Sequence, residues 1–166
     1  MDVFIRIASP KDSDGVTALL RVSYPTLLRD AYEDLILDAV LPAMTVAQPR
    51  LLRSGSYYVA ESAKRIIVGC GGWTKERPGN GEILEGIGHI RHFAVHPEWT
   101  RRGVGQAIYA RCCGDAKAAG LRKFECYSSI NGEAFYAALG FEQLKKIDVE
   151  MLDGITFPSV HMVTTI

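Results

Sequence analysis

A pair of glycines, two residues apart, carries the strongest chemical signal in this sequence. A strand-like stretch ends at Pro97, and Gly103 and Gly105 stand where the next helix is expected to begin. The first turn of a helix has backbone N–H groups without intrahelical partners, and the helix dipole adds partial positive charge there. Because glycine lets a ligand approach the backbone closely, this turn predicts a site for a phosphate or diphosphate. Arg101 and Arg102 can add positive charge to it.

Two other phosphate-binding motifs fit this segment less well. A P-loop requires Lys followed by Ser or Thr after its last glycine, whereas Gly105 is followed by Gln106. A dinucleotide-binding fingerprint requires a third small residue at a position that Ile108 occupies here. Taken alone, two glycines at a helix start are also compatible with a helix that binds nothing.

The four cysteines do not form a metal-binding pattern. Cys70, Cys112, Cys113 and Cys126 show no Cys-x-x-Cys spacing and no histidine at ligand spacing, so we expect no zinc or other metal. Free thiols are typical of a cytoplasmic protein, and that is the expected location. The first six residues lack the charged-then-apolar order of a signal peptide.

Alternating and helical spacings of apolar residues predict the elements that position these groups. Pro25 is expected to begin a helix and Pro42 to end it, since proline lacks the N–H that a helix interior requires. Asn131 can cap a short helix, and Gly120 and Gly140 can close helices in the left-handed conformation. Strands are expected at residues 3–8, 57–61, 66–73, 89–96, 123–127, 141–152 and 156–166, and helices at 9–22, 25–42, 103–119 and 131–139, with a turn around Asp153-Gly154.

This order predicts one α/β (α+β) domain over residues 1–166, with a single mixed, largely antiparallel sheet and helices on both faces. The helix after Pro97 can cross over to a parallel strand at Lys123. Basic and acidic residues balance at 19 each, which gives no support for a nucleic-acid partner. No stretch is expected to be long and apolar enough to span a membrane.

Two segments in the right order resemble the GNAT N-acetyltransferases. His89-Ile-Arg-His-Phe-Ala-Val-His-Pro97 followed by Arg101-Arg-Gly-Val-Gly105 is similar to the family's fourth strand and acetyl-CoA loop. Asn131-Gly-Glu-Ala-Phe-Tyr-Ala-Ala-Leu-Gly-Phe141 is similar to the family's later Asn, Tyr and Gly-Phe region, with compressed spacing. The sequence departs from the family at Thr100, which stands where the family carries Arg or Gln.

The resemblance implies the GNAT fold and direct transfer of acetyl from acetyl-CoA to an amine, without a metal. It assigns the oxyanion donor to the backbone N–H of Val95. The residues it implies for cofactor binding are Phe93, Ala94, Val95, Arg101, Arg102, Gly103, Val104, Gly105, Gln106, Asn131 and Tyr136.

His89 is the first candidate for the general base, because an imidazole titrates near neutral pH and the family carries Glu or His at this position. His92 and Glu85 are reserve candidates, and His96 and His161 are interpreted as structural or surface residues. Tyr136 matches the family's tyrosine near the leaving thiolate and is the candidate acid. His89 paired on a strand face and Tyr136 packed against the sheet are the structural alternatives, and Cys126 as a covalent nucleophile is a third mechanism.

The acceptor is expected to be the primary amine of a small molecule rather than of a protein. The resemblance places the acceptor near the first helices and the loop before the fourth strand, where the candidate residues are Tyr24, Asp30, Tyr32, Glu33, Trp73 and Glu82. The alternative function is a non-catalytic acyl-CoA-binding or sensing module on the same fold. A homodimer is a further expectation from the resemblance.

Overall fold

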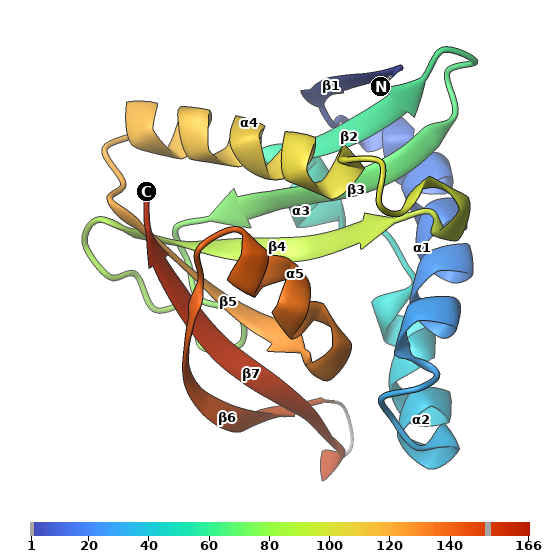
Figure 1. Ribbon diagram of the computed structural model, residues 1–166, viewed down its shortest axis with the longest axis vertical. Helices are drawn as coiled ribbons and strands as arrows, with labels where there is room; N and C mark the ends of the chain where they lie inside the picture. Colours follow the sequence, from blue (N-terminus) through green and yellow to red (C-terminus); the bar gives the residue numbers. More distant parts are fainter. Residues whose placement is uncertain (1, 152–153) are drawn as a thin grey trace.

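The computed structural model describes residues 2–151 and 154–166. Its strands form a seven-stranded sheet in the order β1-β2-β3-β4-β5-β7-β6, as Figure 1 shows. Neighbouring strands are antiparallel except for β4 and β5, which are parallel. The strands are β1 Val3–Ile7, β2 Tyr57–Ser62, β3 Ile67–Thr74, β4 Ile87–Val95, β5 Lys123–Ser129, β6 Glu142–Glu150 and β7 Thr156–Thr165. The mixed, mainly antiparallel sheet that the sequence predicts is confirmed.

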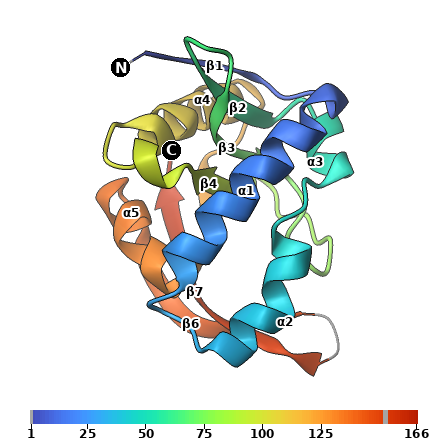
Figure 2. The same ribbon diagram turned by 90° about the vertical axis from the view of Figure 1, so that its right-hand side faces the viewer.

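Helices cover both faces of this sheet (Figures 1 and 2). They are α1 Ser13–Leu28, α2 Asp34–Met44, α3 Pro49–Arg53, α4 Val104–Ala118 and α5 Glu133–Ala138. On one face, α4 and α5 pack on Ile90, Phe124 and Met162 in one apolar cluster. On the other face, α1 and α3 pack on Val59 and Cys70, while α2 packs on β7. Because the side chains of a strand alternate between the two faces of the sheet, these contacts also show on which face the adjacent strand residues lie.

The N-terminal helices differ from the sequence prediction at both prolines. Pro25 lies inside α1 and Pro42 lies inside α2, so neither begins nor ends a helix. Each helix loses one backbone hydrogen bond there, but burial of Leu20 and Leu28 in α1 and of Val40 in α2 outweighs that loss. The short helix α3 was not expected. Of the predicted turn around Asp153-Gly154, Asp153 lies outside the described part of the chain, and Gly154 has a positive φ of 73°.

The segment Asp34–Arg53 is long and apolar enough by composition to cross a membrane, with a mean hydropathy of 1.3 over its most apolar stretch. The expectation that no stretch reaches this level was therefore wrong. In this fold the segment is two helices, α2 and α3, separated by residues 45–48.

Strands β4 and β5 part from each other soon after they meet. Their pairing covers only three positions and ends at His89 opposite Glu125. Beyond that point β5 pairs only with β7, and β4 pairs only with β3. We call the backbone of Ile90–Val95, which β5 leaves unpaired, the splayed edge of β4.

A β-bulge bends β4 just where it parts from β5. Cys70 pairs with Ala94 and Gly72 with Arg91, so two residues of β4 lie opposite Gly71 alone. One of the two, His92, has a positive φ of 53°, which is uncommon outside glycine. Bulges bend the strand that contains them, and this one redirects β4 at the splayed edge.

Candidate active site

The splayed edge presents two backbone N–H groups away from β3. The N–H of His96 donates to the carbonyl of Val68 on β3, and Ala94 pairs with Cys70. Because successive residues of a strand point to opposite edges, the N–H groups of Phe93 and Val95 face the side from which β5 has departed. The prediction that Val95 offers a free N–H is consistent with this arrangement, and Phe93 adds a second donor.

Helix α1 holds this edge in place through hydroxyl groups. Ser23 Oγ donates to the carbonyl of Val95 at 2.9 Å, and Tyr24 Oη donates to the carbonyl of Phe93 at 2.8 Å. With these two carbonyls bonded to α1, the N–H groups of Phe93 and Val95 are left to bind a ligand at this part of the edge. Tyr24 therefore supports the strand backbone, a role that the sequence interpretation, which placed it beside the acceptor, did not foresee.

The N-terminus of α4 has the open backbone that the glycine pattern predicts. Gly103 is the N-cap residue in the left-handed conformation, with φ 79°, and provides no capping side chain. The first intrahelical bond runs from the N–H of Ala107 to the carbonyl of Gly103. The N–H groups of Gly103–Gln106 therefore have no partner within the helix, and we call these four groups the cradle.

The cradle adjoins the splayed edge and is covered on one side by an aromatic ring. A Cβ at Gly105 would lie 2.9 Å from Cζ of Phe135 and 3.6 Å from Cγ2 of Val95. Arg102 places its guanidinium 4.9 Å from the ring of Trp99, and Arg101 is exposed with φ 59°. Thr100, at the unusual position, bonds the carbonyl of Pro97 through its hydroxyl and lies outside the cradle.

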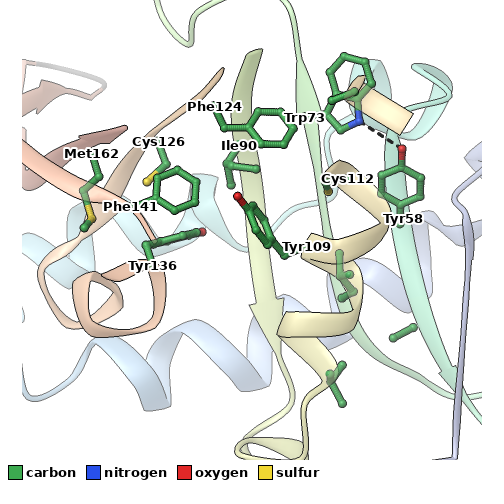
Figure 3. Close-up of a cluster of buried hydrophobic side chains, with 14 of the residues drawn as sticks. Tyr58, Trp73, Ile90, Tyr109, Cys112, Phe124, Cys126, Tyr136, Phe141 and Met162 are labelled. Atoms are coloured by element: carbon green, nitrogen blue, oxygen red, sulfur yellow. Dashed lines mark hydrogen bonds between the residues drawn. The ribbon is translucent and has the colours of Figure 1, made fainter. Parts of the chain in front are cut away.

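Tyr136 lies on the α4 and α5 face of the sheet, next to the splayed edge. Its ring is 9% exposed and packs edge-on against Phe93, Phe135 and Phe141. In Figure 3 its hydroxyl points away from Met162 and toward the side on which Ile90 of β4 lies. Burial raises its pKa well above the ordinary value, so the hydroxyl keeps its proton and can donate it.

His89 lies on the opposite face, in a buried polar network. Its side chain is 1% exposed, and Nε2 lies 3.2 Å from Oε2 of Glu125 on β5. Arg77, from the loop between β3 and β4, donates to both oxygens of Glu125 at 3.0 to 3.3 Å. His161 Nε2 lies 3.5 Å from Oε1 of Glu125. Arg77 also forms an ion pair with Glu82 through Nη1, the guanidinium nitrogen that does not bond Glu125. We call His89, Glu125, Arg77 and His161 the histidine network.

The pKa values of Glu125 and His89 indicate which residues of this network are charged. Burial opposes ionisation of Glu125, but the hydrogen bonds from Arg77, its charge and the interactions with His89 and His161 together outweigh burial and lower the pKa of the carboxyl. Burial lowers the pKa of His89 to about 4, with Arg77 and Arg91 acting in the same direction and Glu125 opposing them. The network therefore contains an ionised carboxylate beside a neutral imidazole. Arg77 donates to both carboxylate oxygens, and the described residues include no group of three or more His, Cys, Asp or Glu placed to hold a metal ion.

Stability is expected to fall as the pH decreases from about 7 to about 5, because His89 is buried in its neutral form. Its pKa is about 4 in the folded protein, against the ordinary value of 6.5 for an exposed histidine, so the unfolded chain binds more protons in this window. We expect a loss of about 1 to 2 kcal/mol in unfolding free energy. Chemical denaturation at both pH values measures it, and His89→Gln should show a shallower decline. Equal slopes for the two proteins would contradict the assignment.

The reserve candidates for the base are less suitable. His92 lies in the bulge, where its Nε2 is 3.0 Å from the carbonyl of Met44 and its other ring nitrogen is buried without a hydrogen-bond partner among residues 2–151 and 154–166. Glu85 is exposed in the loop before β4. The geometry therefore favours His89, the residue next to which β4 and β5 begin to part.

Several residues singled out from the sequence have structural positions. Asn131 is not the helix cap: Ser129 accepts from the N–H of Gly132, and the Asn131 amide donates to the carbonyl of Leu27. Tyr32, in the turn between α1 and α2, donates its hydroxyl to the carbonyl of Pro158 on β7, and Trp73 lies in the core on the α4 face. These positions differ from the sequence-based expectations because each side chain contacts residues far away in the chain, and local residue spacing does not encode such contacts.

The cysteines show no sign of activation. Cys126 is 2% exposed within the apolar cluster under α4, and burial raises the pKa of its thiol far above the ordinary value. Burial likewise raises the pKa of Cys70 to about 12. A thiol without a nearby base or cation in an apolar environment is a poor nucleophile. A surface hollow of about 600 Å³ lies apart from the splayed edge, between Arg6 and Arg65 beside β1.

Sequence comparison identifies a family model that matches this region. The model of the acetyltransferase (GNAT) domain matches residues 53–143, which is just over half of the 166-residue chain. The match spans β2 to β5 and α4, including the splayed edge and the cradle. A search of the curated proteins found no significant match.

Solved structures with the same fold cover the whole chain. A GCN5-related N-acetyltransferase from Rhodopseudomonas palustris has a TM-score of 0.81 at 21% identity, with 100% of this chain and 97% of that chain covered. The PaiA N-acetyltransferase from Thermoplasma acidophilum, solved with coenzyme A, has a TM-score of 0.75 at 15% identity, with both chains covered completely. N-acetylglutamate synthase from Neisseria gonorrhoeae, solved with coenzyme A and N-acetyl-glutamate, has a TM-score of 0.61 at 18% identity, with 99% of this chain and 35% of that chain covered.

Proposed function

Because this chain belongs to the GNAT acetyltransferase family, we propose that it transfers the acetyl group of acetyl-CoA directly to a primary amine of a small molecule. The observation that carries the proposal is the arrangement around one break in the sheet. The cradle and the splayed edge adjoin each other, while Tyr136 and His89 lie on opposite faces at that break. An amine that enters from one face of the sheet can thus react with an acetyl group bound from the other face.

Backbone groups account for binding of the acetyl donor. The four N–H groups of the cradle suit a diphosphate, and the positive end of the α4 dipole favours its charge. The extended arm of the donor can then lie along Phe93, Ala94 and Val95, where β5 leaves the edge of β4 unpaired. Two of the structural neighbours are solved with coenzyme A, which supports this choice of donor.

The proposed chemistry uses four groups near the break. The amine attacks the thioester carbon, and the N–H groups of Val95 and Phe93 stabilise the negative charge that grows on the carbonyl oxygen. As the carbon–sulfur bond breaks, Tyr136 donates its proton to the leaving thiolate. His89 accepts the proton that the amine nitrogen loses, directly or through a water.

The enclosure of His89 favours a slender acceptor. With 1% of its side chain exposed, the imidazole leaves little room for an acceptor, which favours an unbranched primary amine, alone or through a single water, over a bulky secondary amine. This is the support for a small amine over a folded protein surface. The acidic residues that the sequence suggested as acceptor contacts, Asp30, Glu33 and Glu82, are exposed.

A binding and turnover screen tests the proposal. Acetyl-CoA at millimolar concentration should raise the melting temperature of the protein by mass action. A panel of amines, amino acids, polyamines and peptides should contain a compound that releases free CoA thiol. The absence of a melting shift would refute the donor assignment. A shift without turnover across the panel would instead favour a non-catalytic acyl-CoA-binding module.

A further inference from the structure

The histidine network contains a residue that the family resemblance does not assign. We propose that Glu125 is a positioning residue for the reaction: it orients His89 so that Nε2–H faces the carboxylate and Nδ1 is left to accept the proton of the amine. This inference rests on the proposed function, because it gives the general base its tautomer and its orientation.

The sheet register brings these two residues together. His89 and Glu125 are the last pair of β4 and β5 before the strands part, and their side chains share the face opposite α4. The Nε2 to Oε2 distance of 3.2 Å allows a hydrogen bond, although the two groups are not yet aligned for one. Catalytic hydrogen bonds are often loose in a free enzyme and become shorter when substrate binds.

The carboxylate itself is rigidly held. Arg77 Nε and Nη2 donate to Glu125 in a bidentate pair, which fixes the plane of the carboxylate as well as its position. Glu125 is 5% exposed, so the pair is sheltered from water. Each oxygen then has one histidine beside it, His89 on Oε2 and His161 on Oε1.

Charge complementarity determines which nitrogen of His89 carries the hydrogen. An ionised carboxylate only accepts hydrogen bonds, and a neutral imidazole has a single N–H, so the N–H belongs on Nε2. Neither ring nitrogen has a hydrogen bond among the described residues, but Nε2 has the carboxylate beside it, and Nδ1, also buried, keeps an unbonded lone pair. When the N–C bond forms, the amine N–H bond breaks and its proton moves to Nδ1. The resulting imidazolium is stabilised by Glu125 until it returns the proton to solvent.

The other groups around His89 do not compete for this role. Arg77 and Arg91 are cations that disfavour a protonated ring, and His161 acts in the same direction. Tyr127 approaches His89 only ring to ring, at 6.2 Å. Glu125 is thus the carboxylate that can stabilise the imidazolium, and its loss should weaken the base.

Kinetics with a matched pair of variants tests the proposal. Glu125→Gln should lower kcat by about 10²-fold and move the acidic limb of the pH profile, while the Kd for acetyl-CoA stays unchanged. Glu61→Gln is the control, because it removes a carboxylate from another arginine pair, with Arg6, on strand β2 and away from His89. It should retain wild-type kcat and the wild-type pH profile. Equal effects of both variants, or an unchanged pH profile in Glu125→Gln, would refute the positioning role.

The tautomer of His89 provides a readout independent of turnover and of any variant. Long-range ¹H–¹⁵N NMR of the free wild-type protein should show His89 protonated on Nε2 and unprotonated on Nδ1. A spectrum with the proton on Nδ1 would overturn the inference even if the enzyme is active. Conversely, if no amine is acetylated, the proposed function fails while the tautomer still decides the inference about Glu125.

Discussion

Replacing Tyr136 with phenylalanine is expected to lower kcat by about 10²-fold or more and to leave acetyl-CoA affinity nearly unchanged. The substitution removes only the hydroxyl, and the ring keeps its packing against Phe93, Phe135 and Phe141. Without this donor the thiolate must leave unprotonated, which raises the barrier to carbon–sulfur bond cleavage. Steady-state release of CoA thiol measures kcat, and calorimetric titration measures the Kd for acetyl-CoA.

A second buried tyrosine separates loss of the acid from loss of packing. Tyr109 on α4 belongs to the same apolar cluster, is 8% exposed and packs against Phe124 and Phe141. Tyr109→Phe should therefore have a kcat close to that of the wild-type enzyme. Comparable losses in the two variants would mean that the hydroxyl of Tyr136 has no special role in the transfer.

Replacing Gly105 with valine is expected to weaken acetyl-CoA binding by at least about tenfold, or roughly 1.4 kcal/mol. A Cβ at this position lies 2.9 Å from Phe135 Cζ, so the side chain would both push against that ring and cover the cradle. The diphosphate could then no longer approach the N–H groups closely. Calorimetric titration with acetyl-CoA measures the change, and CoA without the acetyl group should be weakened equally because the two share the diphosphate.

Another glycine of the same helix provides the matched control. Gly114 lies on the exposed side of α4, where a new Cβ would meet nothing within 4 Å. Gly114→Val makes the same chemical change in the same helix and should leave acetyl-CoA affinity unaltered. If Gly105→Val bound acetyl-CoA as tightly as Gly114→Val does, the diphosphate would have to bind away from the N-terminus of α4.

The chemistry of the proposed transfer is divided between the two faces of the sheet. Tyr136 and the apolar cluster lie on the face covered by α4, whereas His89 and Glu125 lie on the other. This separation keeps the proton donor for the thiolate apart from the proton acceptor for the amine. The acid Tyr136 and the base His89 therefore cannot exchange a proton directly with each other.

Local sequence signals predicted the parts of the fold that depend on neighbouring residues. The strands β1 to β5 and helix α4 lie within a few residues of their expected positions, because alternating and helical apolar spacings are properties of short segments. Gly120 and Gly140 have the positive φ values that helix ends require. The open cradle at Gly103 was also predictable, since it depends only on glycines at a helix start.

Only the tertiary structure decided which distant groups meet at the site. Glu125 and His161 carry no local mark of function, and they join His89 through the register of β4, β5 and β7. Pro25 and Pro42 remain inside helices because burial of their neighbours exceeds the cost that local propensity assigns to proline. By itself the sequence determined the elements and the glycine-rich backbone at the start of α4. The bulge, the parting of the strands and the partner of the imidazole depend on contacts between residues far apart in the chain, which only folding brings together.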